Sequence, residues 1–135
     1  MITREADYSV RALHHLARPE NLDHNVTVAQ LAERMDIPFR HLRRITLRLV
    51  QAGLLRSEKG RNGGLRLNRS PEDITLYEVL QEMDARNVHL NLCILLPDAC
   101  NRQPNCEVNR QLCKLQETLD EGLKGITMAD LCDKI

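Results

Sequence analysis

The sequence predicts a mainly α-helical fold with a small β-hairpin wing, in which a winged helix-turn-helix is followed by a long dimerisation helix. Apolar residues recur at helical spacing through most of the 135-residue chain, and a short turn at 36–38 joins two of the helical patterns. A glycine-rich segment also separates two short apolar runs. We expect one integrated domain, with the winged helix-turn-helix at 1–84, a cysteine-bearing loop at 85–106, and the dimerisation helix and a C-terminal helix at 107–135.

Start and stop signals bound the helices that precede the wing. Thr3 precedes an amphipathic pattern that ends before Pro19. The segment Thr27–Gln30 has the sequence of a capping box, and Pro38 suits the first position of the next helix, which ends at Gly53. Two helices joined by a tight turn, the second of them basic, form the pattern of a helix-turn-helix.

The pattern then changes to strands and back to a helix. The short apolar runs 54–55 and 65–67 flank a segment in which Asn62-Gly63 is a hairpin turn signal, so we expect a two-stranded wing. A helix follows from the capping box at 75–78 and runs to about Asp84.

A long helical pattern follows the cysteine-bearing loop, and the box at 127–130 opens a last short helix. Apolar positions of the long helix are spaced four, three, four and four residues apart, so this stripe must pack against something. A second copy of the chain is a natural partner. The predicted dimerisation residues are Val108, Leu112, Leu115, Leu119 and Leu123.

The formal net charge of zero conceals a division along the chain. Residues 1–70 contain 13 Lys or Arg against 7 Asp or Glu, a net charge of +6, whereas residues 71–135 contain 6 against 12, a net charge of −6. The first part is a candidate polyanion-binding surface, and the second part fits a sensing or dimerising role.

Arginines follow one face of the third helix. Arg40, Arg44 and Arg48 lie four residues apart, and like charges at this spacing destabilise a helix until an anion relieves their repulsion. An arginine near the start of a recognition helix can bridge guanine O6 and N7, and glycines in the wing let its cations approach a phosphate or minor groove. A solvated arginine face is the alternative, which the combination of helix and wing disfavours. The predicted DNA-binding residues are Pro38, Phe39, Arg40, His41, Arg43, Arg44, Arg48, Lys59, Gly60, Arg61, Asn62 and Gly63.

Cys93, Cys100 and Cys106 are spaced C-x6-C-x5-C in a stretch with two prolines, where a continuous helix is not expected. Thiolates in an irregular loop can converge on one centre, and these soft ligands select iron–sulfur clusters, zinc or copper(I). Clusters usually have four ligands, so one ligand is missing from the run. The alternative is that these cysteines are small apolar residues of a loop, but their flanks are polar.

The N-terminus is charged and no stretch approaches the length of a membrane span, so we expect a cytoplasmic protein without a secretory signal. The chain has five cysteines, an odd number. In a reducing compartment they indicate metal binding or redox chemistry rather than a disulfide framework. We do not expect an enzyme, because the chain offers no substrate-pocket motif, no nucleophile with a base and no nucleotide loop.

Over nearly its whole length the chain resembles the Rrf-type winged-helix regulators, which include IscR-, NsrR- and CymR-like branches. The resemblance implies a homodimeric transcription regulator with a long helix near the dimer axis. It also implies an iron–sulfur cluster (2Fe-2S or 4Fe-4S) held by the three cysteines. The segments that carry the resemblance are Asp7–Leu13, Ala52–Leu54, Gly60–Leu67, Ile74–Val79, the three cysteines and Ile126–Leu131.

The resemblance is strongest to the NsrR-like branch. IscR-like members complete the ligand set with a histidine three residues after the last cysteine, where this chain has Asn109, a poor ligand. NsrR-like nitric-oxide sensors instead use a carboxylate from the first helix of the partner subunit, and the matching residue is Asp7. Cys113, about two helical turns beyond Cys106, is the competing fourth ligand. Cys132, on an apolar face of the last helix, is expected to pack in the core.

Three function classes follow. The leading one is a transcriptional repressor whose DNA affinity changes when nitric oxide, oxygen or a redox change damages its cluster. The second, implied by the CymR-like branch, is a cluster-free thiol or sulfur-metabolism regulator that uses the same cysteines for oxidation or for contact with a metabolic enzyme. The third is an electron-transfer iron–sulfur protein.

Overall fold

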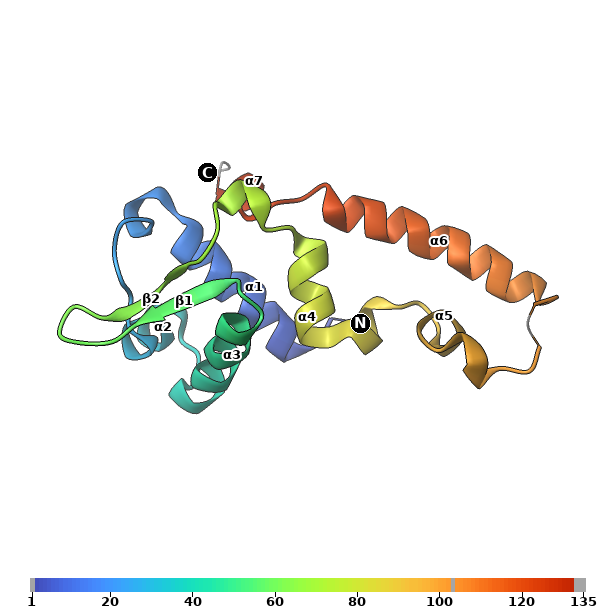
Figure 1. Cartoon of the computed structure of the whole chain (residues 1–135), viewed down its shortest axis with the longest axis horizontal. Coiled ribbons are helices and arrows are strands. Elements are labelled where there is room, and N and C mark those ends of the chain that lie inside the picture. The colour runs from blue at the N-terminus through green and yellow to red at the C-terminus, as the bar shows by residue number, and fades with distance from the viewer. Residues whose placement is uncertain (1, 103, 133–135) are drawn as a thin grey trace.

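The computed structural model describes residues 2–102 and 104–132, which form a body and an extended arm (Figure 1). The body contains α1 (Arg4–Ala17), α2 (Val28–Met35), α3 (Phe39–Gln51), β1 (Leu55–Glu58), β2 (Gly64–Leu67), α4 (Leu76–Val88) and α7 (Met128–Cys132). The arm contains α5 (Leu92–Leu95) and α6 (Glu107–Lys124). Short 3-10 helices are η1 (Pro19–Asn21), η2 (Pro71–Asp73) and η3 (Pro97–Ala99). The prediction of a mainly helical fold with a hairpin wing is confirmed.

Three helices begin directly after a threonine N-cap, at the positions that the sequence predicted. The side-chain oxygens of Thr3, Thr27 and Thr75 each accept a hydrogen bond from a backbone N–H in the first turn of the next helix. At Thr27 the capping box is reciprocal, because the Gln30 side chain accepts from the Thr27 backbone N–H. Pro38 was predicted at the first position of the helix. It is instead the N-cap of α3, because its ψ of 130° is not helical, and the helix begins at Phe39.

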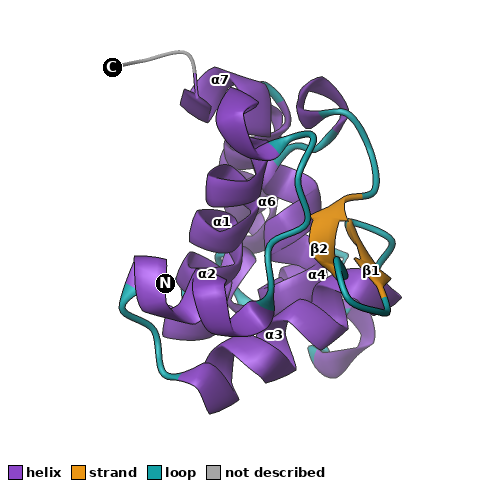
Figure 2. Ribbon diagram, turned by 90° about the vertical axis from the view of Figure 1, so that its left-hand side faces the viewer, coloured by secondary structure: helices purple, strands orange, loops and turns teal. Residues whose placement is uncertain are grey.

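The core lies around α1, which runs through the body and contacts α2, α3, α4, α7 and β2 (Figure 2). Full burial of a leucine or isoleucine side chain contributes about 1.5–3 kcal/mol, so this cluster holds the recognition helix in place. Its largest fully buried side chains include Leu13, Leu16, Leu31, Leu42, Ile45, Leu49, Leu54, Leu80 and Met128.

The wing is an antiparallel hairpin with Leu55 opposite Leu67. Its connecting loop spans 59–63 and contains the Asn62-Gly63 pair that predicted a hairpin. The left-handed residue of this loop is Gly60, with φ of 105°, and Asn62 keeps an ordinary negative φ. The prediction of a two-stranded wing is confirmed.

A residue from the body extends the wing. Val26 and Leu65 exchange two backbone hydrogen bonds of 2.8 and 3.1 Å. A Cβ at the neighbouring Gly64, whose φ is 150°, would lie 2.8 Å from the carbonyl carbon of Val26. Gly64 is therefore required by the pairing between wing and body.

Helix α4 is kinked and directs the chain into the arm. The sequence predicted its end at Asp84, and there the backbone is non-helical (φ −158°, ψ 47°), but helix resumes as far as Val88. The Asp84 carboxylate accepts hydrogen bonds from the Thr3 backbone N–H (3.0 Å) and the Asn87 side chain (2.6 Å). The kink is thus fixed against the start of α1.

Gln116 of α6 attaches the arm to the end of α4. Its side chain is 4% exposed, and its Nε2 donates to the carbonyl of Val88 (3.2 Å) while its Oε1 accepts from the backbone N–H of Leu90 (2.8 Å). Just beyond the C-terminal end of α6, the carbonyl of Ile126 accepts from the backbone N–H of Leu76 (2.9 Å). The middle of α6 is therefore hydrogen-bonded to the end of α4, and the segment after α6 to the start of α4. No described helix is both long and apolar enough to cross a membrane.

Candidate metal and DNA-binding sites

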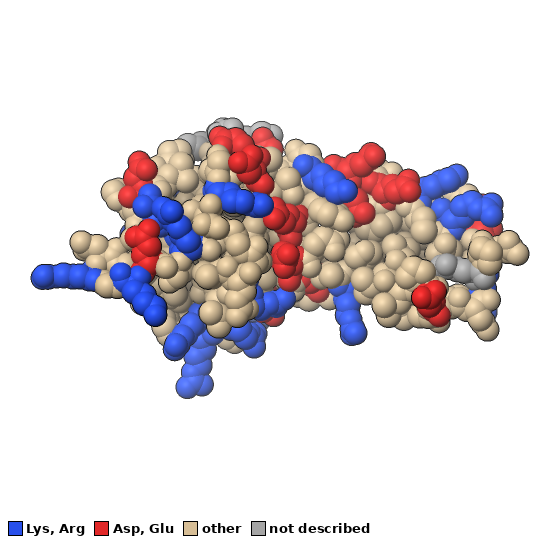
Figure 3. Space-filling model, in the orientation of Figure 1, with Lys and Arg blue, Asp and Glu red and all other residues tan. Residues whose placement is uncertain are grey.

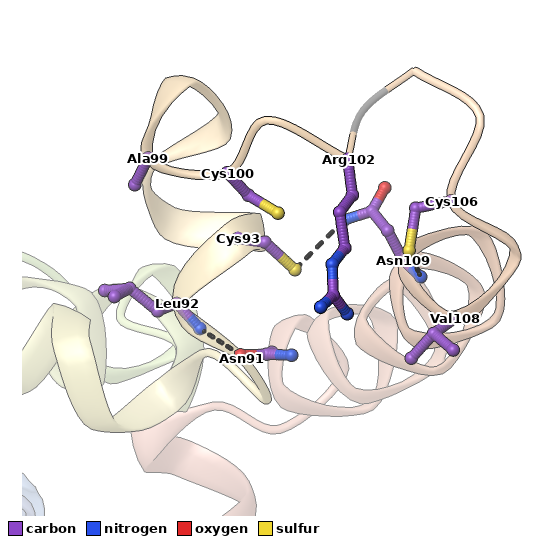
Figure 4. A pocket seen from close by; sticks show the side chains of 9 residues that line it. All are labelled: Asn91, Leu92, Cys93, Ala99, Cys100, Arg102, Cys106, Val108 and Asn109. Carbon is purple, nitrogen blue, oxygen red and sulfur yellow. Dashed lines mark hydrogen bonds between the residues drawn. The ribbon is translucent and has the colours of Figure 1, made fainter.

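The three cysteines of the run line one cavity of about 280 Å³ (Figure 4). The short helices α5 and η3 turn the chain so that Cys93 and Cys100 point into the same space, and Cys106 is the N-cap of α6. All three side chains are half-buried, and none is in a disulfide. The rest of the lining is Asn91, Leu92, Ala99, Arg102, Val108 and Asn109.

Asn109 lies between the thiols. Its backbone N–H donates to Cys106 Sγ (3.4 Å), and its side-chain Nδ2 donates to Cys93 Sγ (3.2 Å). Cys113 Sγ donates to Asn109 Oδ1 (3.7 Å). Sequence reasoning treated Asn109 as a poor ligand and missed these contacts. Its position three residues after Cys106 and four before Cys113 on one helix face was the available signal.

The donor set fits an iron–sulfur cluster. Among the described residues, no three His, Cys, Asp or Glu side chains lie close enough together to hold a single metal ion. A cluster, however, spreads its cysteine ligands over more than one iron atom, so its thiolates surround a small volume. Three soft sulfur donors around one cavity, with N–H groups directed at two of them, have the chemistry that such a group requires.

The two candidates for a fourth ligand lie elsewhere. Asp7 is on α1 in the body, where its Oδ2 lies 2.8 Å from Arg11 Nε, and the cysteine cavity is in the arm. The hydrogen bond and charge of Asp7 raise the pKa of Arg11 above its ordinary value. Cys113 lies beyond Asn109, outside the lining of the cavity. Within one chain, the structure brings neither residue to the three thiols.

The start of α3 and the tip of the wing expose the predicted DNA-binding residues. Phe39 is 47% exposed, and the neighbouring polar side chains of α3 are also exposed, as is the loop around Lys59. Lys and Arg side chains project from the wing and from the side of the body where α3 lies, and acidic side chains gather over the middle of the molecule and along α6 (Figure 3). The exposed members on α3 are Pro38, Phe39, Arg40, His41, Arg43 and Arg44, and those on the wing are Lys59, Gly60, Arg61 and Asn62.

Arg48 has intramolecular partners that the sequence did not indicate. Its Nη1 donates to Glu5 Oε1 (3.0 Å), and its Nη2 donates to the backbone carbonyls of Glu82 (3.0 Å) and Met83 (3.4 Å). Arg48 therefore joins α3 to α1 and to α4 just before the kink. Of the predicted DNA-binding arginines, it is the one that the fold itself uses.

Comparison with known proteins places these features in a family. The family model Rrf2, described as an iron-dependent transcriptional regulator, matches residues 2–134. The chain belongs to the Rrf2 family. The HTH-type transcriptional regulator NsrR of Shouchella clausii is 35% identical over 123 residues, covering 90% of this chain and 76% of that protein. NsrR of Bacillus subtilis is 32% identical over 131 residues, covering 90% and 78%.

Solved structures share the fold of this Rrf2 regulator. CymR, the global cysteine regulator of Bacillus subtilis, matches with a TM-score of 0.78 at 19% identity, covering 98% of this chain and 95% of that one. IscR of T. potens matches with a TM-score of 0.74 at 24% identity, covering 97% and 85%. The winged-helix prediction is confirmed by these neighbours.

The long helix of this Rrf2 protein leaves an apolar stripe in solvent. Val108, Leu115 and Leu119 are 66%, 59% and 38% exposed, and Leu112 and Leu123 are half-buried. Leu92, which lines the cysteine cavity, is also 58% exposed. Contiguous exposed apolar surface of this kind marks an interaction site.

Proposed function

We propose that this Rrf2 protein is a homodimeric DNA-binding repressor that senses nitric oxide, or a change in redox or iron–sulfur status, through an iron–sulfur cluster held by Cys93, Cys100 and Cys106. The observation that carries the proposal is the convergence of these three half-buried thiols on one cavity. The iron-dependent description of the family and the NsrR relatives support it.

The DNA interface in this proposal is the start of α3 together with the wing. Arg40, Arg43 and Arg44 are exposed and have the length to reach base edges in the major groove. Lys59 and Arg61 stand at the wing tip, where they can neutralise phosphates or enter a minor groove.

The fourth ligand is Asp7 of the partner subunit. Each cysteine cavity lies in an arm that leads away from its own α1, so a carboxylate from α1 can serve only the cysteines of another copy. A cluster bound there would supply iron atoms that nitric oxide and oxidants can attack. An oxygen ligand is a poor match for a sulfur-bound iron, so Asp7 would be the most weakly bound ligand of such a cluster.

Hydrogen bonds connect the cysteine arm to the recognition helix. Gln116 fixes α6 to the end of α4, and Arg48 of α3 donates to two carbonyls before the α4 kink. Release of Asp7 would free α1 from the partner's arm and let the two α3 helices change their separation. A dimer fits two half-sites only at a fixed spacing, so DNA affinity would fall.

Three measurements test this proposal. Anaerobic native mass spectrometry and visible spectroscopy detect the cluster, and a binding assay with an operator selected from random duplexes measures DNA affinity. We expect the wild type to carry a cluster, and nitric oxide to weaken DNA binding by about 5–150-fold, the usual range of coupling between two sites. Alanine at Cys93, Cys100 or Cys106 should abolish the cluster. The Asp7→Ala variant should keep a cluster with an altered spectrum and nitric-oxide response, and the control Cys132→Ala should behave as wild type.

Two results would contradict the proposal in different ways. A wild-type protein that binds its operator but takes up no iron would favour the cluster-free thiol regulator. If Cys113→Ala loses the cluster while Asp7→Ala keeps the wild-type spectrum and nitric-oxide response, the cluster is held by four cysteines.

A further inference from the structure

Asn109 contacts sulfur or thiol groups with its backbone N–H and with both polar groups of its side chain. The backbone N–H donates to Cys106, the side-chain amide N–H donates to Cys93, and the amide oxygen accepts from Cys113. One residue thus joins two cysteines that are 13 positions apart in the sequence, across the cavity they line.

Cys93 and Cys113 together match the amide orientation of Asn109. The NH₂ group faces Cys93, and the amide oxygen faces Cys113, whose S–H donates to it. A thiol can donate or accept, but a thiolate ligand can only accept. With Cys93 as a thiolate ligand, the NH₂ group must face it, and the amide oxygen is then left to accept from Cys113. Cys113 therefore acts here as an anchor for Asn109, in a position outside the cavity lining.

We infer that Asn109 is a positioning residue that holds Cys93 and Cys106 around the cavity and raises the reduction potential of a cluster bound there, while Cys113 supports it by donating to its amide oxygen. The second part rests on the cluster of the proposed function. Hydrogen bonds to cluster sulfurs stabilise the more negative, reduced state, and such bonds are one of the factors that set cluster potentials. The same bonds hold the two thiols in place before any metal binds.

The first experiment tests positioning and does not need a cluster. Cobalt(II) alone is titrated into the apo-protein, and binding is followed by thiolate-to-cobalt absorption. The thiols must draw together to bind one ion, so the cobalt affinity reports how near to one another Asn109 holds them. Loss of a residue that supports metal ligands typically weakens affinity 10–100-fold, so we expect Asn109→Ala to weaken cobalt binding by about 10-fold or more. The matched control is Asn101→Ala, in an exposed residue of the same loop. Equal affinities for wild type and Asn109→Ala would overturn the positioning role.

The second experiment measures the reduction potential of the anaerobically purified protein. Asn109→Asp replaces the donor that faces Cys93 with a carboxylate of the same shape, so we expect a lower potential in the molecules that carry a cluster. Cys113→Val should shift the potential in the same direction by less, and Asn101→Asp, which adds the same charge to an exposed position, should not shift it. Unchanged potentials in both Asn109→Asp and Cys113→Val would overturn the tuning role.

The two measurements separate this inference from the proposed function. If the wild type carries no iron but Asn109→Ala weakens cobalt binding, the positioning role stands and the cluster proposal fails. If the wild type carries a cluster and neither measurement responds to Asn109, the cluster proposal stands and this inference fails. Loss of iron in Cys113→Val would also overturn the inference, since Cys113 would then be a ligand.

Discussion

Arg44 and Arg48 are one turn apart on the same face of α3, but their surroundings differ. Arg48 makes hydrogen bonds to Glu5 and to two carbonyls of α4. The side chain of Arg44 is 64% exposed, and its Nε lies 3.8 Å from the same Glu5 carboxylate. A loose, exposed ion pair contributes about 0–1 kcal/mol, so Arg44 can leave it for DNA at little cost. The sequence pattern cannot separate the two arginines, because their distinguishing partners are distant in the chain.

The DNA interface predicts two different effects at the residue scale. If Arg44 reads a base, Arg44→Ala should cost on the order of 1–3 kcal/mol in DNA binding and relax base preference. Lys59→Ala should weaken binding to all sequences and reduce the salt slope by about one, because it removes one phosphate contact. Arg110→Ala, in the arm, is the control, and fluorescence anisotropy with the selected operator provides the affinities. Unchanged binding in both variants would place the recognition surface elsewhere.

At the scale of elements, the break in α4 is held by the Arg48 side chain of α3 and by the backbone N–H of Thr3, the N-cap of α1. In an unbroken helix the carbonyls of Glu82 and Met83 would accept from backbone N–H groups four residues later. The non-helical Asp84 interrupts this pattern, and Arg48 donates to both carbonyls. Burial raises the pKa of Asp84, but hydrogen bonds from Asn87 and Thr3 outweigh it and the pKa is lowered. The kink is therefore a specified feature of the fold.

Arg48→Met should destabilise the protein through these lost bonds. Hydrogen bonds that involve a charged group contribute about 1.5–3 kcal/mol, and the partial exposure of Arg48 reduces this, so we expect a loss of about 1–2 kcal/mol in the free energy of unfolding. Arg44→Met, the matched variant one turn earlier, should lose about 0–1 kcal/mol. Urea unfolding followed by circular dichroism measures both. Equal stabilities for the two variants would mean that the Arg48 contacts do not hold the kink.

The features of these elements that the sequence predicted depend on residues that are close together in the chain. Caps such as Thr27 depend on residues three positions away, so their helix starts were predicted correctly. The capping pattern at Thr75 also gave the start of α4, but its continuation past Asp84 depends on Thr3, 81 residues away. The cysteine spacing predicted a shared metal site; the three cysteines line one cavity, and metal binding there stays a prediction. The bridging role of Asn109 was not predicted, because an amide is a poor metal ligand and the residue was considered only as a ligand.

At the scale of the whole molecule, the arm is built around a surface that its own chain does not cover. Gln116 faces the body and is buried, while Val108, Leu115 and Leu119 on other positions of α6 remain exposed. If a second copy covers this stripe, its own α6 brings an equivalent stripe, as a two-fold interface requires. The Asp7 proposal requires that the same contact bring the cysteine cavity of one chain towards α1 of the other.

Leu115→Asp should therefore convert the dimer to a monomer without unfolding the chain. Truncating a leucine in a shared core costs about 2–5 kcal/mol, and a buried unpaired carboxylate adds to this, so the dimer Kd should rise by at least about 30-fold. Because Leu115 is 59% exposed in the isolated chain, helical content should stay as in wild type. Glu117→Lys, an exposed change elsewhere on α6, is the control. Sedimentation velocity over a concentration series measures the change, and a Leu115→Asp protein that remains fully dimeric at low micromolar concentration would place the interface on another surface.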